Sequence, residues 1–372
     1  MNKAFKALLR LAFTTAVLFS VSPASWGQGR VVYHDASEFP AYGQAFKASA
    51  EHPFRRLPES LKGEVRDAVW DLGCYSAGIY VRFRSDAPEI HVKWTNNANH
   101  MPHMTDCGTG GLDLYTLIGG KWRHVGSAFT WGTPTTSHIG KLVGNMDPQM
   151  REYMLYLSLY DEVKTLQLGI PEGRTIEGPA VESPIADRPI VMYGTSILQG
   201  GCASRPGMAF TNILARRFDR TVINLGFSGN ALLDFEIAQR MASVDAPSVY
   251  VLDYVPNASA EDIDQKGERF FRILRDAHPD IPVIFVEDPQ FSHSVVDKAI
   301  AEEIRTKNTS QKALFQKLKK AGEKRIYYIA SEGMTGFDGD AFVDGIHLTD
   351  LGMERYADHI EKTIRKALKS AR

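Results

Sequence analysis

Hydrophobic and polar positions follow two patterns along the chain, and the change between them comes near residue 180. From about residue 30 to residue 178, apolar and polar residues alternate in short runs that Gly, Pro and Asn interrupt, which is typical of β-strands. The runs with this alternation are Ala77–Phe83, Glu89–Trp94, Leu112–Ile118, Lys121–Phe129, Glu152–Tyr160 and Val163–Ile170. Asp161 and Glu162, between the last two runs, predict a hairpin turn. Many short, closely spaced strands indicate an antiparallel β-sandwich of jelly-roll type.

After Pro184 the pattern changes, and apolar runs alternate with amphipathic ones. The predicted strands are Pro189–Gly194, Thr221–Leu225, Ser248–Leu252, Ile281–Val286 and Arg325–Ile329. The predicted helices are Gly207–Phe218, Leu233–Ala242, Ser259–Ala277, Asp297–Ala321 and a last one that begins at Thr349 or Asp350. Ser259 and Asp262 have a spacing close to that of a capping box. Strands that alternate with helices indicate a parallel, doubly wound α/β sheet with helices on both faces.

The first residues have the composition of a secretory signal peptide. Three basic residues precede an apolar run over Leu11–Val21, and the small residues Ser25 and Gly27 follow it. The apolar run is shorter than the roughly 20 residues that span a bilayer, which favours removal over anchoring. We therefore expect an exported protein, periplasmic or secreted, with no integral membrane segment once the signal is removed.

The two patterns and the signal divide the chain into three predicted parts. These are a signal peptide at residues 1–27, a jelly-roll-like β-sandwich at residues 28–178 and an α/β domain at residues 185–372. Glu172–Arg188, rich in Pro, Gly and Glu, is the predicted linker.

Composition narrows the classes of function. The 372 residues include 43 Lys and Arg against 44 Asp and Glu, so the chain has no basic field for nucleic acid. Three cysteines, Cys74, Cys107 and Cys202, are too few for a disulfide scaffold or a multi-cysteine zinc site. One pair of them could form in an oxidising compartment, and whether Cys74 and Cys107 pair stays open, as does the oligomeric state.

Polar residues gather where the predicted parallel strands end. In an open parallel sheet, ligands bind at the carboxyl ends of the strands. The four segments with such residues there are Tyr193–Ile197, Asn224–Asn230, Asp253–Asn257 and Asp344–His347. Together they supply a serine, a histidine, a carboxylate and several hydrogen-bond donors.

These four segments, in this order, resemble the blocks of the SGNH (GDSL-like) hydrolase family. The resemblance implies a flavodoxin-like three-layer α/β/α domain with Ser196 as nucleophile, His347 as base and Asp344 as its partner. It also implies an oxyanion hole formed by Ser196, Gly229 and Asn257. Two further segments, Gly110–Tyr115 and Gln199–Gly207, look like a subgroup of two-domain bacterial esterases whose sandwich carries a Gly-x-Asp-Leu-Tyr motif.

The sequence departs from the family pattern at two positions. Thr195 stands where the family has aspartate, and no aspartate follows Asn257. The chemistry agrees with the resemblance in other respects, because a serine hydroxyl needs a base within hydrogen-bond reach. His347 would take the Ser196 proton, and Asp344 would hold the imidazole tautomer.

Each block by itself has an ordinary interpretation. Gly-Thr-Ser after a strand is often a helix N-cap, Asp-x-x-His is common in solvated loops, and Ser228-Gly229 and Asn257 suit a turn and a cap. Four such blocks at four strand ends favour catalysis. The sequence has no Gly-x-Ser-x-Gly elbow and no Gly-x-Gly-x-x-Gly or phosphate loop after the first strand, which disfavours the α/β-hydrolase and nucleotide-binding classes.

Other residues are candidates for binding substrate or metal. His100, His103, Asp106 and Cys107 lie close in sequence, but their spacing matches no known metal site, so we expect no metal and interpret the segment as a polar loop that reaches over the cleft. The candidates for contact with substrate are Tyr254, Phe227, His103 and Trp131, together with Phe291 and His293. The alternative is that they are ordinary core or rim residues.

The sequence therefore predicts an exported serine esterase that works through an acyl-enzyme without metal or organic cofactor. An acetylated carbohydrate is the favoured substrate, on the grounds of the family resemblance, the export signal and the added sandwich. One alternative is a lipase or thioesterase for longer acyl chains. The other is a non-catalytic glycan-binding protein on a hydrolase scaffold.

Overall fold

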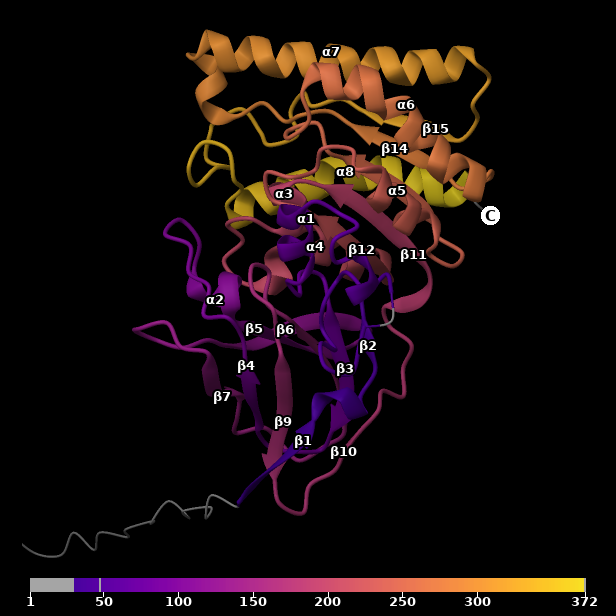
Figure 1. Ribbon diagram of the computed structural model, residues 1–372. Coiled ribbons are helices and arrows are strands. Elements are labelled where there is room, and N and C mark those ends of the chain that lie inside the picture. The colour runs from indigo at the N-terminus through magenta and orange to yellow at the C-terminus, as the bar shows by residue number, and fades with distance from the viewer. Residues whose placement is uncertain (1–29, 47, 371–372) are drawn as a thin grey trace, which may run out of the picture. The chain divides into compact units, whose positions relative to one another are not determined.

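The computed structural model describes residues 30–46 and 48–370, and their strands form three β-sheets (Figure 1). The predicted signal peptide at residues 1–27 lies outside these residues. Within them, no helix combines the length and the apolar character needed to cross a bilayer.

Two antiparallel sheets make up the N-terminal part. The first has the order β1-β9-β4-β7, and the second has the order β10-β3-β8-β5-β6, with β2 paired to β3. The strands are β1 (Val31–Asp35), β2 (Ala41–Tyr42), β3 (Tyr80–Ser85), β4 (Ile90–Thr95), β5 (Leu112–Ile118), β6 (Lys121–Ala128), β7 (Ser137–Val143), β8 (Arg151–Tyr156), β9 (Thr165–Pro171) and β10 (Ile176–Glu177). Short helices α1 (Asp67–Gly73) and α2 (Asp106–Gly110) lie between them, with 3₁₀ turns at Ala36–Glu38 and Glu59–Leu61.

The core of this part lies between the two sheets. Strand β4 shows why, because Ile90, Val92 and Trp94 alternate with partly exposed residues and are themselves at most 1% exposed. They pack with inward residues of the other sheet, among them Phe83 and Leu155. Period-two alternation therefore produces a half-buried strand here, as the sequence predicts. The jelly-roll description stays a prediction.

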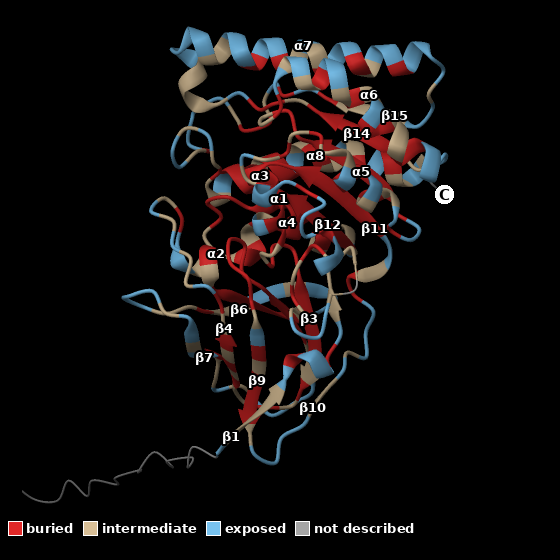
Figure 2. Cartoon of the chain, in the orientation of Figure 1, coloured by how far each residue is buried: buried red, intermediate tan, exposed pale blue. Residues whose placement is uncertain are grey.

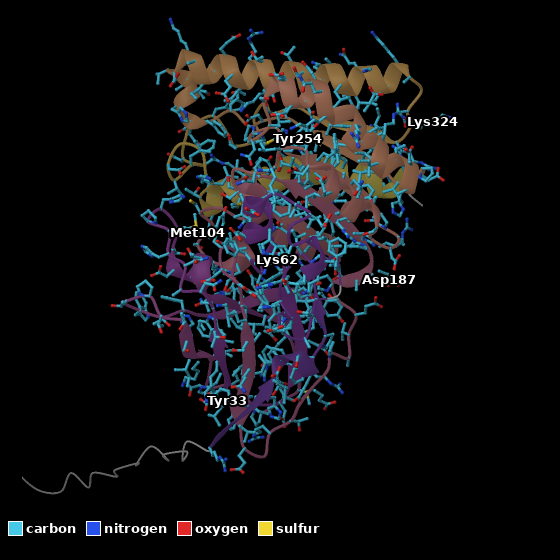
Figure 3. The ribbon with its side chains drawn as sticks, viewed as in Figure 1. Tyr33, Lys62, Met104, Asp187, Tyr254 and Lys324 are labelled. Carbon is cyan, nitrogen blue, oxygen red and sulfur yellow. The ribbon has the colours of Figure 1, made fainter. Side chains whose placement is uncertain are left out.

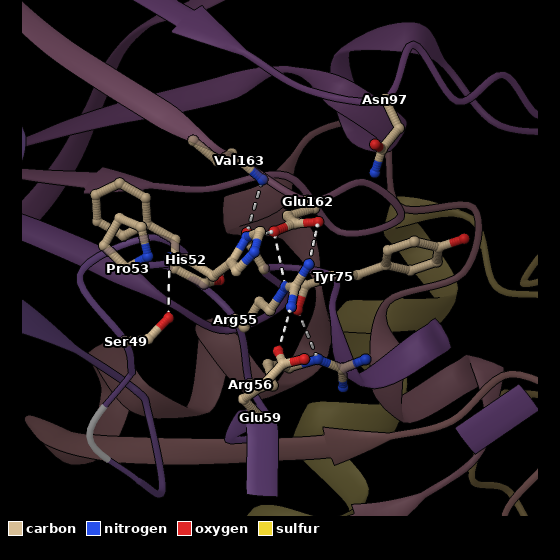
Figure 4. A network of polar contacts seen from close by, with 12 residues as sticks. Ser49, His52, Pro53, Arg55, Arg56, Glu59, Tyr75, Asn97, Glu162 and Val163 are labelled. Atoms are coloured by element: carbon tan, nitrogen blue, oxygen red, sulfur yellow. Dashed lines mark hydrogen bonds and ion pairs between the residues drawn. The ribbon is translucent and has the colours of Figure 1, made fainter. Parts of the chain in front are cut away.

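The hairpin predicted around residues 161 and 162 is wrong. Strand β8 lies between β3 and β5, whereas β9 lies between β1 and β4 in the other sheet. Asp161 and Glu162 are buried rather than at a solvent-exposed turn. The Asp161 carboxylate accepts hydrogen bonds from the backbone N–H groups of Asn97 and Asn99, both at 2.9 Å. The Glu162 carboxylate accepts one from Arg55 Nε at 2.8 Å (Figure 4). These hydrogen bonds hold the segment in which the chain crosses from one sheet to the other.

The C-terminal part is a parallel α/β sheet, as predicted. Its strand order β12-β11-β13-β14-β15 is the 2-1-3-4-5 order of flavodoxin-like sheets. The strands are β11 (Ile185–Gly194), β12 (Arg220–Gly226), β13 (Val249–Asp253), β14 (Val283–Val286) and β15 (Ile326–Ile329). The helices are α3 (Ser196–Gln199), α4 (Phe210–Phe218), α5 (Phe235–Ala242), α6 (Ala260–Ala277), α7 (Lys298–Lys320) and α8 (Asp350–Ser370), with 3₁₀ turns at Pro206–Met208 and Ser292–Val295.

Helices cover both faces of this sheet. Helices α5, α6 and α7 pack on one face, while α4 and α8 pack on the other. The sheet between them is buried throughout most of its length (Figure 2). This explains why β13 reads as a continuous apolar run rather than an alternating one. The predicted capping box of Ser259 and Asp262 is confirmed at the start of α6.

The Gly-x-Asp-Leu-Tyr motif ties the sandwich to the α/β part. Asp113 of β5 is fully buried and accepts Arg205 Nη1 at 2.6 Å and the Gly207 backbone N–H at 2.9 Å. The Tyr115 hydroxyl accepts the same Nη1 at 2.6 Å. A Cβ on Gly207 would lie 2.3 Å from that hydroxyl, so the loop approaches closely only because residue 207 is glycine. The motif therefore positions the loop that follows the Ser196 turn.

Charge stabilises this contact. Burial opposes ionisation of Asp113, but the hydrogen bond from His124 and the charge of Arg205 outweigh it and lower the pKa of the carboxyl. Because the pKa is lowered in the folded state, the ion pair contributes its stability above the ordinary aspartate pKa of about 3.9. That contribution is lost as the pH falls through the lowered pKa.

We expect Asp113→Asn to lower the free energy of unfolding by about 3–5 kcal/mol, because it leaves the Arg205 charge without its buried partner. Urea unfolding at pH 7 measures the effect. Ser127→Ala is the matched control, since it removes a neutral donor to the same carboxylate (2.9 Å) and is expected to cost about 1 kcal/mol. Equal effects of the two substitutions would contradict this role of the charge.

Candidate active site

Ser196 lies at a tight turn between β11 and α3. Thr195 is the N-cap residue, and its hydroxyl accepts the Ile197 backbone N–H at 3.3 Å. Gly194 is packed so closely that a Cβ would lie 2.5 Å from the Asp253 carbonyl oxygen. The capping role thus belongs to Thr195, which leaves the Ser196 hydroxyl free to take another partner.

That partner is His347, which follows a turn before α8. His347 Nε2 lies 2.9 Å from Ser196 Oγ, and His347 Nδ1 lies 2.7 Å from Asp344 Oδ2. Asp344 Oδ1 also accepts the backbone N–H groups of Ile346 and His347, at 3.0 and 2.8 Å. The structure therefore brings the three residues predicted as nucleophile, base and carboxylate into one hydrogen-bonded chain.

The charge of Asp344 decides how protons are arranged in this chain. Burial favours the neutral acid, but the hydrogen bonds from the His347 ring and from two backbone N–H groups outweigh it and lower the pKa of Asp344 to about 2. An ionised carboxylate can only accept, so His347 Nδ1 carries the hydrogen. Nε2 is then the acceptor for the Ser196 hydroxyl proton.

A pocket of about 390 Å³ opens beside this chain. Ser196, His347, Gly229 and Asn257 line its reactive end. Most of the remaining wall comes from α7 and the segment before it, which supply Ile300 and Ile304 with Phe291, together with His293, Glu303 and Lys307. Ile346, next to His347, completes the apolar part of the wall. The pocket thus combines one polar corner with an apolar wall, which is the usual composition of small-molecule sites.

The polar corner holds hydrogen-bond donors. Gly229 adopts φ +67°, which residues with a side chain rarely adopt, and its backbone faces the pocket. Asn257 accepts the Ala231 backbone N–H through Oδ1 at 3.3 Å, which leaves its Nδ2 group to donate. Both residues were predicted for an oxyanion hole, and both line the pocket that contains Ser196.

Comparisons with known proteins bear on this geometry. The profile of the GDSL-like Lipase/Acylhydrolase family matches residues 187–365, and that of the "N-terminus of Esterase_SGNH_hydro-type" matches residues 31–176. A crystal structure described as a GDSL-like lipase from Bacteroides ovatus is 32% identical, with a TM-score of 0.86 over 91% of this chain and 98% of that one. This chain belongs to the GDSL-like lipase/acylhydrolase family.

More distant members of the same fold carry different activities. A salicylyl-acyltransferase from a tetracycline biosynthetic pathway is 15% identical, with a TM-score of 0.73 over 91% of this chain and 98% of that one. A family two carbohydrate esterase from Cellvibrio japonicus is 12% identical, with a TM-score of 0.60 over 92% and 100% of the two chains. No curated protein sequence matches the chain. For this GDSL-like hydrolase, the likeness to these two structures shows the fold, and membership in the family supports ester hydrolysis.

Three of the residues predicted to touch substrate lie away from the pocket of this GDSL-like hydrolase. Tyr254 (labelled in Figure 3) and Phe227 are fully buried in the core under α5 and α6, and the Tyr254 hydroxyl donates to Gln311 of α7 at 2.7 Å. Trp131 is 85% exposed and packs on Phe129 at the edge of the sandwich. The position of a residue after a strand does not determine whether its side chain points into the pocket or into the core. The side chains of Tyr254 and Phe227 point into the core.

His103 does reach the site. Its ring lies 5.4 Å from that of His347, centroid to centroid. His100 and Asp106, from the same predicted loop, instead form a pair with each other at 3.0 Å. Cys74, Cys107 and Cys202 are all free, so the structure contains no pair of Cys74 with Cys107.

Arg56 was not foreseen, and no motif in the sequence marks it. Its guanidinium is only 2% exposed and donates to the carbonyl oxygens of Asn224 and Gly226, at 3.2 and 2.6 Å. It also holds the carbonyls of Leu72 and Tyr75, at 2.6 and 3.0 Å. Burial lowers the pKa of Arg56 to about 10. A cation from the N-terminal part therefore holds the strand end that leads into the Gly229 turn.

Two buried carboxyl groups lie at the ends of the neighbouring strands. Asp253, at the end of β13, pairs with Gly194 of the neighbouring strand β11. Its Oδ1 accepts a hydrogen bond from the Tyr356 hydroxyl at 2.8 Å. No described residue makes a hydrogen bond to its Oδ2 or to either oxygen of Asp288, although Lys307 Nζ lies 4.0 Å from Asp288 Oδ2. Burial raises the pKa of Asp253 to about 8 and that of Asp288 to about 7.

These raised values predict how stability depends on pH. A group whose folded pKa lies above its unfolded pKa of about 3.9 keeps a proton that the unfolded chain loses, so stability falls as pH rises between the two values. The fall is about 1.4 kcal/mol per pH unit for each group. We expect Asp253→Asn to reduce this slope up to about pH 8 and Asp288→Asn to reduce it up to about pH 7. Urea unfolding from pH 5 to pH 8 measures it, and wild-type slopes in both variants would refute the assignment.

Proposed function

We propose that the protein is a serine esterase that cleaves its substrate through an acyl-enzyme on Ser196. The observation that carries this proposal is the continuous hydrogen-bonded chain from Asp344 through His347 to Ser196, which opens into the 390 Å³ pocket. A serine with a base in contact, and a third group that orients the base, is the arrangement that nucleophilic catalysis needs.

The geometry supports a two-step mechanism. Ser196 Oγ attacks the ester carbonyl carbon while His347 Nε2 takes the hydroxyl proton of Ser196. His347 keeps its Nδ1 hydrogen, which remains hydrogen-bonded to the Asp344 carboxylate. The imidazolium then returns the proton to the leaving alcohol, and the acyl group remains on Ser196. In the second step, a water molecule attacks the acyl carbonyl while the same Nε2 takes its proton. The acid then leaves, and the proton passes from Nε2 to Ser196 Oγ.

The developing oxyanion needs donors that are in place beforehand. We propose the backbone N–H groups of Ser196 and Gly229 and the Nδ2 group of Asn257 for this task. Each such donor is typically worth about 2.7–4 kcal/mol of transition-state stabilisation. Arg56 would act indirectly, as a positioning residue that holds the strand end before Gly229.

We propose O-acetyl groups on a carbohydrate as the substrate. Support comes from the fold shared with carbohydrate esterases, among them the enzyme from Cellvibrio japonicus, and from the predicted export signal, which would bring a periplasmic or secreted enzyme to polysaccharide. The second candidate is a longer acyl chain. It is favoured by the apolar wall of Ile300, Ile304, Phe291 and Ile346, which offers more apolar surface than an acetyl group requires.

We further infer that the N-terminal part is a jelly roll that buttresses the catalytic part. When the short strands β2 and β10 are set aside, eight strands remain, in sheets of order β1-β9-β4-β7 and β3-β8-β5-β6. These are the strand orders of an eight-stranded jelly roll. Asp113 and Arg56 would carry this support, because Asp113 holds the loop at Gly207 and Arg56 holds the strand end at Gly226.

Hydrolysis of matched p-nitrophenyl esters from acetate to decanoate, followed by acetate release from acetylated xylan and acetylated cellulose oligomers, tests the proposal. We expect the highest kcat/KM with acetate and release of acetate from at least one glycan. A preference for octanoate or decanoate would replace the acetyl proposal with the second candidate. Failure of a fluorophosphonate probe to label Ser196 in the folded protein would refute the nucleophile and revive a non-catalytic glycan-binding role.

A further inference from the structure

Three potential metal ligands converge beside Ser196. They are His103 from the loop after β4, Cys202 from the turn after α3, and His347 itself. One ligand atom from each residue lies within 4.8 Å of the others. The sequence separates these residues by about 100 and 145 positions, so no local spacing could reveal the group.

Contacts around the group hold the first two ligands in place. Thr105 Oγ1 donates to the Ser204 carbonyl oxygen at 2.5 Å, which joins the His103 loop to the Cys202 turn. Ser204 is in turn held by Asp350 through its backbone N–H and its hydroxyl, at 2.9 and 2.6 Å. Met104, labelled in Figure 3, is only 6% exposed and anchors the loop in the apolar core. The approach of His103 to His347 is therefore fixed by packing and hydrogen bonds.

Cys202 occupies a costly backbone conformation. Its φ is +67°, in the left-handed region that residues other than glycine rarely adopt. Glycine or asparagine would adopt it with less strain, whereas cysteine brings a thiol to the neighbourhood of two imidazoles. Such strain is commonly found at functional sites, and the thiol has no role in the ester mechanism.

The ligand set suits a borderline-soft transition-metal ion, and Zn²⁺ is the ion we consider. Two imidazoles and a thiolate are ligands for Zn²⁺, with distances of about 2.1 Å to nitrogen and about 2.3 Å to sulfur. Around a tetrahedral ion these distances place ligand atoms roughly 3.5 Å apart. The three ligand atoms, which lie within 4.8 Å of one another, would therefore close by up to about 1 Å on binding. Asp344 already accepts from His347 Nδ1, so a metal on Nε2 would find the carboxylate–histidine arrangement that usually supports a metal-bound imidazole.

We propose that His103, Cys202 and His347 bind Zn²⁺ and that the ion reversibly inhibits the enzyme. This rests on the proposed function, because inhibition follows from the role of His347 as base. An Nε2 lone pair that binds Zn²⁺ cannot accept the Ser196 proton. Binding of the thiol would release its proton to solvent, and removal of the metal would restore both the thiol and the Ser196–His347 hydrogen bond.

Metal binding is measured first, without reference to activity. Equilibrium dialysis of the apo-protein against ZnCl₂ gives stoichiometry and affinity, and CoCl₂ in its place reports a thiolate ligand through thiolate-to-cobalt charge-transfer absorption. We expect one tight site per chain and such an absorption band. Cys202→Ser should weaken Zn²⁺ binding at least tenfold and abolish the band, and His103→Gln should also weaken binding at least tenfold. Cys107→Ala is the matched control and should bind as wild type does, since Cys107 is outside the group.

Inhibition is measured next, by titrating ZnCl₂ into p-nitrophenyl acetate assays and reversing it with EDTA. Cys202→Ser should keep wild-type activity without metal and require at least tenfold more Zn²⁺ for half inhibition. Unchanged Zn²⁺ affinity in both Cys202→Ser and Cys202→Ala would overturn the site, whereas full activity of a Zn²⁺-saturated enzyme would overturn inhibition. If the chain binds Zn²⁺ through these residues but hydrolyses no ester, the proposed function fails and the metal site stands.

Discussion

Replacing Ser196 with alanine is expected to lower kcat/KM for p-nitrophenyl acetate by about 10⁴–10⁶-fold while the protein stays folded. Without Oγ there is no nucleophile for the acyl-enzyme, and the His347 base has no hydroxyl to deprotonate. The remaining rate would come from the oxyanion donors acting on water. Initial rates measured against the buffer blank, with circular dichroism to check the fold, give the result.

Ser228→Ala is the matched control for this substitution. Ser228 lines the same pocket as Ser196, but Ser196 Oγ is the hydroxyl in contact with the base. We expect the control to stay within about tenfold of wild type, the range for loss of a pocket contact. If Ser196→Ala retained more than one hundredth of the wild-type activity, another residue would have to be the nucleophile.

Asp344→Asn is expected to lower kcat by about 10³–10⁴-fold with little change in KM. The asparagine amide can donate to His347 Nδ1, which would place the ring hydrogen on Nε2 and remove the acceptor for the Ser196 proton. The loss should be somewhat smaller than for Ser196→Ala, because Asp344 is about one third exposed and water can partly replace its charge. Steady-state kinetics at pH 8 measure both parameters.

Asp340→Asn controls for the loss of a negative charge in the same loop. Asp340 lies four positions earlier and makes no contact with His347 among the described residues. Its replacement should leave kcat within about twofold of wild type. A similar loss of kcat in both variants would mean that loop charge, rather than the Asp344–His347 hydrogen bond, supports the reaction.

The parallel half of the fold could be predicted from the sequence because its strands are buried on both faces. The strand predicted at Ser248–Leu252 contains the apolar run Val249–Leu252, and it became β13 with a shift of one residue. Helix α6 runs from Ala260 to Ala277, as its capping box and its apolar spacing indicated. Local periodicity suffices where a segment has one dominant environment.

Pairing between strands could not be predicted in the same way. The runs that became β8 and β9 are adjacent in sequence and joined by polar residues, which is the pattern of a hairpin. Asp161 and Glu162 are instead buried against Asn97, Asn99 and Arg55, which are far away in sequence. Tyr254 is likewise buried in the core, because its ring packs under the helices and its hydroxyl donates a hydrogen bond to Gln311.

The sequence by itself determined the alternation that makes one half β and the other half α/β, and it determined the chemical types and the order of Ser196, Gly229, Asn257, Asp344 and His347. These are properties of local patterns, because a strand end places its next residues at the edge of the sheet whatever surrounds them. Only the tertiary structure decided which other side chains stand at that edge. Arg56 and Asp113 hold segments next to the reactive residues, while His103 and Cys202 approach His347. These contacts join distant segments, and the packing that forms them cannot be read from local periodicity, even where a motif marks the residue.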